Sequence, residues 1–171
     1  MRAGSLPQRP ADRLGGMATG AQVREQVSTV LTAMGLAFDD AELPGLGAGW
    51  SITLGIGAAR MTVWATEHEV GAAQPMALLV LNAALVVDVP DTEQLARLVS
   101  RRSGDYLLGN PYVAIGEDGR ASVHMRHTLI ADVLADDDLV ATVRMVGLTA
   151  DQLARTIAEE IGGTVAGTPP S

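Results

Sequence analysis

The feature that most constrains the fold is a two-residue periodicity that runs on both sides of Gly57. From Trp50 to Ile56 every second residue is a large apolar one, and the alternation resumes from Met61 to Ala65. Such alternation predicts two half-buried strands, because neighbouring side chains of a strand point to opposite faces. The connection between them, Gly57-Ala-Ala-Arg60, is short. The stretch therefore predicts a β-hairpin.

Gly55 and Gly57 have a second interpretation, since GIGAAR looks like the start of a dinucleotide-binding loop. In that motif the glycines lie between a strand and a helix, whose N-terminus meets the pyrophosphate. The residues after Gly57 have the pattern of a strand instead, and no helix follows within the unit. The sequence favours the turn, and we expect no nucleotide or other cofactor.

Three further elements are expected in the first two thirds of the chain. Helical spacing of apolar residues predicts a helix over 23–34 that ends at Gly35. Residues 77–87 are apolar on both faces, which is typical of a central strand or of one covered by a partner. A helix is expected over 91–104, with Asp91 as its N-cap.

The remainder of the chain predicts another hairpin and two helical segments. The hairpin turn is Glu117-Asp118-Gly119, because glycine adopts positive φ without steric cost. Asp136 to Asp138 suit the start of a helix, whose dipole favours negative charge there. A short helical segment is expected over 138–146.

A separate last helix is predicted from its capping residues. Thr149 is the expected N-cap and Gln152 completes a capping box, while Leu148 and Leu153 stand at the positions of a hydrophobic staple. Gly162 is expected to end this helix.

The predicted order α-β-β-β-α-β-β-α indicates an α+β fold, an antiparallel sheet with helices packed on one face. We expect a single domain over residues 21–163. The flanking segments, 1–20 and 164–171, are predicted to be disordered.

Composition excludes several function classes. The formal net charge of −8 argues against a nucleic-acid partner, which requires a basic face. There is no cysteine, and all twelve basic residues are arginine, so neither a thiolate nor a lysine is present for catalysis. The longest apolar run, Met76 to Val89, is shorter than the roughly 20 residues that a membrane-spanning helix needs. We expect a soluble, cytoplasmic protein without membrane insertion.

The histidines and acidic residues do not predict a metal site. His124 and His127 are three residues apart on a strand and so point to opposite faces. His127 is expected in the core or an interface, and His124 in solvent. Glu67 and Glu69 likewise point away from His68. The acidic run at 136–138 lacks the spaced ligands of an EF-hand, and no G-x-S-x-G motif occurs. We expect no catalytic residue and no metal.

The element order and the stretches that mark it resemble the type III secretion chaperone-like and YbjN-like family. These stretches are WSITLGIGAARMTVWA, LLVLNAALVVDV with PDTEQLARLV, PYVAIGEDGRASVHMRHTLI and GLTADQLARTIAEEIG. The resemblance implies a non-enzymatic protein that binds a peptide segment of a partner protein and forms a homodimer. A regulatory or adaptor module is the first alternative, and a small-molecule-binding protein or enzyme is the second.

Five apolar residues are candidates for a partner or dimer interface. One layer of helices covers only one face of a sheet, so the second face of the strand over 77–87 needs a partner subunit or a client segment. The candidates are Leu79, Leu81, Leu95, Leu98 and Val99. The alternative is that the stripe formed by Leu95, Leu98 and Val99 packs on the protein's own sheet.

Overall fold

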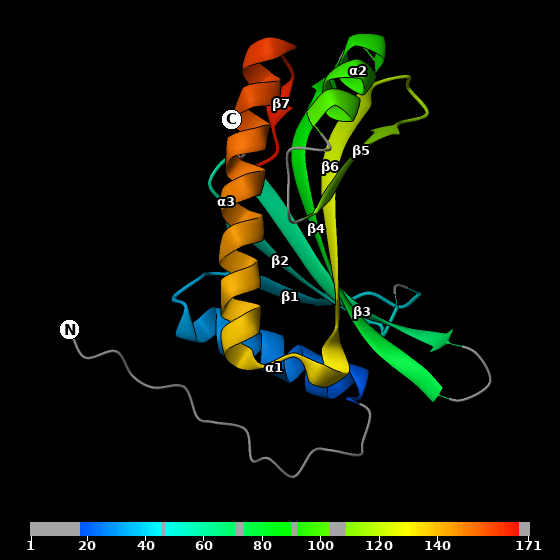
Figure 1. Cartoon of the computed structure of the whole chain (residues 1–171), viewed down its shortest axis with the longest axis vertical. Coiled ribbons are helices and arrows are strands. Elements are labelled where there is room, and N and C mark those ends of the chain that lie inside the picture. The colour runs from blue at the N-terminus through cyan, green and yellow to red at the C-terminus, as the bar shows by residue number, and fades with distance from the viewer. Residues whose placement is uncertain (1–17, 46, 71–73, 90–91, 103–108, 168–171) are drawn as a thin grey trace.

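The computed structural model describes residues 18–45, 47–70, 74–89, 92–102 and 109–167, in which three helices accompany a seven-stranded antiparallel sheet (Figure 1). The elements are α1 (Gly20–Ala33), β1 (Asp39–Glu42), β2 (Trp50–Ile56), β3 (Ala59–Val70), β4 (Gln74–Val89), α2 (Thr92–Arg102), β5 (Asn110–Ile115), β6 (Ala121–Ile130), the 3-10 helix η2 (Ala131–Val133), α3 (Asp136–Glu160) and β7 (Thr164–Val165). The strand order is β1-β2-β3-β4-β6-β5, and β7 pairs with β4. The predicted α+β fold is confirmed, with β1 and β7 as additional strands.

The alternating stretch around Gly57 forms a hairpin, as its periodicity predicts. Ile56 pairs with Ala59, which leaves Gly57 and Ala58 as a two-residue turn between β2 and β3. Gly57 has φ +56°, a conformation that glycine adopts without strain. Strand β3 follows the turn directly. The GIGAAR stretch is therefore not followed by the helix that a dinucleotide loop requires.

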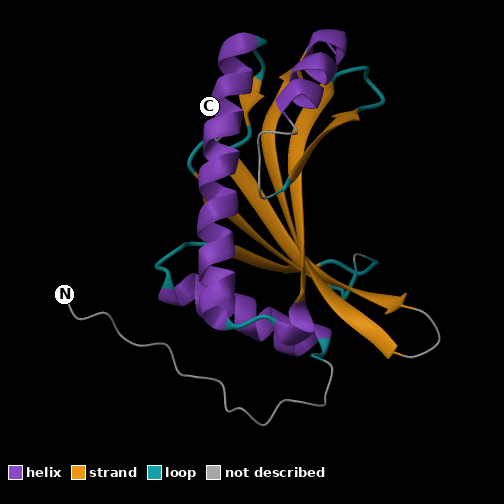
Figure 2. Ribbon diagram, viewed as in Figure 1, coloured by secondary structure: helices purple, strands orange, loops and turns teal. Residues whose placement is uncertain are grey.

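One face of the sheet and all three helices form a single core. The core contains inward-pointing residues of β2, β3, β4 and β6, such as Ile52, Met61 and Leu81, together with buried residues of each helix. Helix α3 runs along the sheet, and α1 lies across the beginning of α3 (Figure 2). Helix packing on one face is thus as predicted. The expected cap Asp91 and the expected helix end Gly104 lie outside the described residues.

Helix α3 is continuous where the sequence predicts two helices. It begins at Asp136, in agreement with the acidic start, but it runs through Thr149 to Glu160. A Cβ on Gly147 would lie 2.7 Å from Cγ2 of Ile56, so the absence of a side chain lets α3 approach β2 closely. The expected N-cap at Thr149 is wrong. So is the staple at Leu148, whose side chain is 71% exposed.

Strand β1 was not predicted, because its sequence DDAE has none of the residues that favour strands. The side chain of Arg24 on α1 binds Asp40 at 3.0 and 3.1 Å and also pairs with Glu42. These two ion pairs tie the exposed strand to the first helix. A charged, short strand at the sheet edge also discourages pairing with other chains.

Two segments predicted to be disordered are partly ordered. Thr19 caps α1 within a capping box, so that helix begins at Gly20, before residue 21. At the other end, β7 pairs with Val86 and Val87 of β4. The N–H of Gly167 then donates to the carbonyl of Ala58 at 2.9 Å, which brings the C-terminal segment against the hairpin turn. The prediction of disorder is wrong for 18–20 and 164–167, and residues 1–17 and 168–171 lie outside the described part.

Candidate functional site

The five residues predicted for an interface lie in the core of the chain itself. Leu79 and Leu81 face the helices, and Leu95, Leu98 and Val99 of α2 belong to the same buried cluster. None of the five is more than 7% exposed. The expectation that they face a partner is therefore corrected: the helix stripe packs on its own sheet, as the alternative had it. The sequence pattern identified them as apolar but could not tell which surface covers them.

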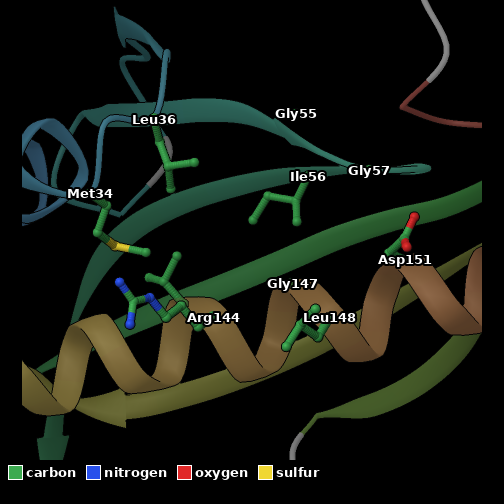
Figure 3. Close-up of a pocket in the computed structure, with 10 residues that line it drawn as sticks. Met34, Leu36, Gly55, Ile56, Gly57, Arg144, Gly147, Leu148 and Asp151 are labelled. Atoms are coloured by element: carbon green, nitrogen blue, oxygen red, sulfur yellow. The ribbon is translucent and has the colours of Figure 1, made fainter.

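A groove of about 560 Å³ lies between α3, the end of β2 and the segment that follows α1 (Figure 3). Most of its lining is apolar or glycine, with one basic and one acidic residue: Met34, Leu36, Gly55, Ile56, Gly57, Val143, Arg144, Gly147, Leu148 and Asp151. Apolar grooves with few polar groups are the usual form of a binding site. This groove is the candidate functional site.

Gly147 and Ile56 set the floor of the groove. Ile56 points from β2 toward α3, and Figure 3 shows it projecting into the space above Gly147. Met34 and Leu36 come from the other side, and both are half-buried against the core. Leu148 stands on α3 with most of its surface in solvent. An exposed leucine beside half-buried apolar residues makes the groove a place where a ligand could bury further apolar surface.

The edge of β2 is open along this groove. Strand β1 pairs with β2 only as far as Thr53, so Leu54, Gly55 and Ile56 extend beyond it. In an antiparallel hairpin with a two-residue turn, Ile56 and Leu54 direct their backbone groups to β3, and Gly55 directs its own outward. The described residues provide no partner strand on that side. No described residue bonds the N–H and C=O of Gly55 on that side, so they are available to an extended segment.

Asp151 fixes one end of the groove. Its carboxylate accepts hydrogen bonds from the N–H of Ala58 at 2.7 Å and from Arg155 Nε at 3.1 Å. These bonds, that of Arg155 first, hold the pKa of the Asp151 carboxyl below its ordinary value. Both bonds end on Oδ1, and this carboxylate anchors the turn to α3.

Arg144 lies at the opposite end of the groove, beside Met34 (Figure 3). It forms no ion pair with any carboxylate of the described chain. Its guanidinium is the one basic group of the lining. The arrangement suits an extended ligand whose side chains are apolar and whose backbone forms hydrogen bonds. The lining offers no pair of groups for acid–base chemistry.

The histidines do not gather with other ligands. Within the described residues no group of three His, Asp or Glu side chains is placed to hold a metal ion. His124 is half-buried and not exposed as expected, because it stacks on Tyr112. His127 is also half-buried. The side chain of His68 lies outside the description.

Sequence reasoning missed the groove, although one signal for it was present. Leu148 breaks the apolar stripe of α3 that Val143, Val146 and Leu153 follow, and an apolar residue off the stripe of a helix is exposed. Met34 and Leu36 gave no sign of a groove, since apolar residues are common where a packed helix ends. Their contribution depends on the way in which three separate segments meet.

The fold and the groove together define a class: a small α+β domain with an apolar groove beside the open edge of a strand. The chain belongs to the TY-Chap1 family, described as "T3SS (YopN, CesT) and YbjN peptide-binding chaperone 1", whose model matches residues 60–169. It is therefore a chaperone-like binding module. No helix in the described ranges is long and apolar enough to cross a membrane.

A solved structure has the same fold. The crystal structure of YbjN from E. coli, described as a candidate transcription regulator, superposes with a TM-score of 0.53 over 80% of this chain and 90% of that one. The two sequences are 13% identical, so the likeness concerns the fold alone. No curated protein sequence matches the chain.

Proposed function

We propose that the chain is a non-enzymatic chaperone that holds an extended, apolar segment of a partner protein in the groove between α3 and β2. One observation carries the proposal: the apolar lining lies directly beside the open backbone edge at Gly55. An extended segment alternates its side chains, so it can bury one set in the groove while its backbone bonds Gly55.

The groove is suited to a segment of a protein rather than to a small polar molecule. Its lining has a single uncommitted charged group, Arg144, since Asp151 is bonded to Ala58 and Arg155. The exposed side chain of Leu148 would lose its contact with water on binding. Burial of apolar surface then provides the main driving force, at about 25 cal/mol per Å².

Peptides selected from a random twelve-residue library on the purified protein test this proposal. We expect the selected peptides to be apolar, and Leu148→Asp to weaken their binding about tenfold or more, measured by fluorescence anisotropy, because a carboxylate would enter the apolar surface. Met145→Asp is the matched control, since Met145 is an exposed residue of α3 (50%) that does not line the groove. Equal binding to wild type and Leu148→Asp would refute the proposal.

The backbone part of the proposal has its own pair of variants. Gly55→Pro removes the outward N–H, whereas Gly55→Ala retains it, and a Cβ at this position would meet no atom within 4 Å. The proline variant is expected to bind the selected peptides more weakly than the alanine variant. Equal binding by both variants would remove the hydrogen bond from the proposal and leave only the apolar contact.

The proposal also includes a homodimer in the cytoplasm. The resemblance to the chaperone-like family supports a dimer, but the buried residues Leu79, Leu81 and Leu98 would not form its interface without opening the core. Light scattering is the direct measurement. A monomer mass up to high micromolar concentration would exclude the dimer and leave the binding groove unaffected.

A further inference from the structure

The face of the sheet opposite the helices is uncovered within the described part of the chain. Side chains on this face, among them Trp64, Asn82 and Tyr112, do not belong to the core that the three helices form with the other face. Even Val80, which is only 6% exposed, is outside that core. Strand pairing sets Trp64 opposite Val80, and Val80 opposite Thr128.

Arg126 of β6 is held at the middle of this face by two aromatic rings. Its guanidinium carbon lies 6.0 Å from the ring centroid of Trp64 and 5.2 Å from that of Tyr112. One of its nitrogens, Nη2, also donates to the Tyr112 hydroxyl at 3.3 Å. Stacking and the hydrogen bond restrict an exposed arginine that would otherwise sample many rotamers.

Tyr112 is itself fixed from two sides. Its hydroxyl donates to Oδ1 of Asn82 at 2.9 Å. Its ring stacks on that of His124, with centroids 5.3 Å apart and planes 19° from parallel, and Nε2 of His124 lies 2.9 Å from Oγ of Ser122. The support of Arg126 therefore extends over β4, β5 and β6, and the guanidinium is preorganised.

The remaining donors of Arg126 are unused by the described chain. A guanidinium has five N–H donors in a planar fork that fits a carboxylate, and no carboxylate of the described residues pairs with this one. A hollow of about 370 Å³ opens beside it, lined by Asn110, Tyr112, Arg126, His127 and Thr128. Strand β5 begins at Asn110, opposite Arg126, so among the described residues no strand neighbours β6 on that side from His127 onward.

The middle of this face, on β3 to β6, carries basic residues and no acidic one, while Asp39 on β1 lies at its edge. Residues 60–66, 78–84, 110–114 and 122–130 contain no acidic residue, although the chain has 20 of them and a net charge of −8. Arg60 adds a second exposed basic residue to the same face. Complementarity therefore favours an occupant with a negative charge.

We propose that this face binds a second, acidic segment of another protein, in which a carboxylate lies beside apolar side chains. The carboxylate binds Arg126 in the hollow, and the apolar side chains pack on Trp64. This surface is separate from the groove, so the proposal does not depend on the proposed function.

Charge disfavours three other occupants of this face: a second copy of the chain, its own residues 1–17 and a nucleic acid. A second copy in a symmetric dimer would bring Arg60 and Arg126 against a face that has no acidic residue in the middle of the sheet. The protein's own residues 1–17 carry Arg2, Arg9 and Arg13 against a single acid, Asp12. A nucleic acid is disfavoured by the net charge of −8.

The two tryptophans provide the assay. The indole N–H of Trp50 is buried and donates to the carbonyl of Gly20 at 3.0 Å, whereas Trp64 lies on the proposed surface. We titrate the full chain, labelled with ¹⁵N, with two capped ten-residue peptides that alternate leucine and serine around a central glutamate or glutamine. The Trp64 indole signal is expected to shift and that of Trp50 to stay, which also reports an intact fold.

The glutamate peptide is expected to bind about fivefold more tightly than the glutamine peptide, because only it offers a charged partner. Arg126→Gln should reduce this ratio to near one. Arg144→Gln is the matched control in the groove and should retain it. The inference is overturned if Arg126→Gln keeps the preference, or if Arg144→Gln removes it, which would assign the acidic segment to the groove.

Two further outcomes would replace the proposed occupant. A shift of the Trp64 signal on raising the protein concentration alone would assign the face to a second copy. A shift caused by a twelve-base-pair DNA duplex at lower concentration than the glutamate peptide would assign it to nucleic acid. Either result overturns the proposal.

Discussion

Gly57→Ala tests how the hairpin turn and α3 are joined at the end of the groove. The residue has φ +56°, and an L-residue pays roughly 1–2 kcal/mol for this conformation. A Cβ would also lie 2.2 Å from Oδ1 and 2.6 Å from Cγ of Asp151, far inside van der Waals contact. Asp151 cannot rotate away without losing its bond from the N–H of Ala58. Overpacking of this kind costs about 1–3 kcal/mol more, so we expect Gly57→Ala to lower the free energy of unfolding by about 2–5 kcal/mol.

The two contributions separate in a double-mutant cycle with Asp151→Ala. With the carboxylate removed, only the Cβ of residue 151 remains close, at 3.1 Å, so the cost of Gly57→Ala should fall toward the conformational part, roughly 1–2 kcal/mol. Urea unfolding followed by circular dichroism gives all four free energies. Gly55→Ala is the matched control, since its Cβ meets no atom within 4 Å and Gly55 does not have positive φ. An equal penalty for Gly57→Ala in both backgrounds would show that Gly57 and Asp151 are not in contact.

Two other predictions concern stability. Leu98→Ala should lower the free energy of unfolding by about 2–4 kcal/mol, because Leu98 is 3% exposed. Ala96→Gln, on the exposed face of α2, is its control. An unchanged urea midpoint together with loss of a dimer in light scattering would contradict the burial of Leu98. Burial, with Arg126 as a lesser cause, lowers the pKa of His124, and burial lowers that of His127. The unfolded chain then binds more protons just below about pH 6.5, so the urea midpoint should fall as the pH falls from 6.5 toward 5. His124→Gln with His127→Gln should flatten that dependence, and an unchanged slope would exclude both histidines as its source.

The parts of the fold that were predictable are those encoded locally. Two-residue alternation identified β2 and β3, and positive φ at Gly119 and Gly35 agrees with the predicted turn and helix end. In each case the signal and the structure involve the same few residues. No knowledge of the rest of the chain is needed to interpret them.

The parts that failed depend on contacts between distant residues. Strand β1 is formed by pairing with β2, and Arg24 binds its Asp40 and Glu42; neither contact can be read from the strand propensity of DDAE. Gly147 resembles a helix break in the sequence, yet it serves the close approach of α3 to Ile56. The interface prediction was wrong for the same reason. The sequence shows that the five residues are apolar, but not which surface covers them.

The walls of the groove come from distant parts of the chain, and the contacts that hold them determine where a ligand gains binding free energy. Met34, Leu36 and Ile56 are already half-buried against the core, and Asp151 fixes the turn at Ala58. A groove whose walls are held without a ligand loses little conformational entropy on binding, so more of the apolar contact contributes to affinity. Its rim is less constrained at Leu148, which stands in solvent on a rigid helix. The binding free energy should therefore concentrate at Leu148 and the open edge at Gly55, where ligand contact is new, rather than at the residues that the core already covers.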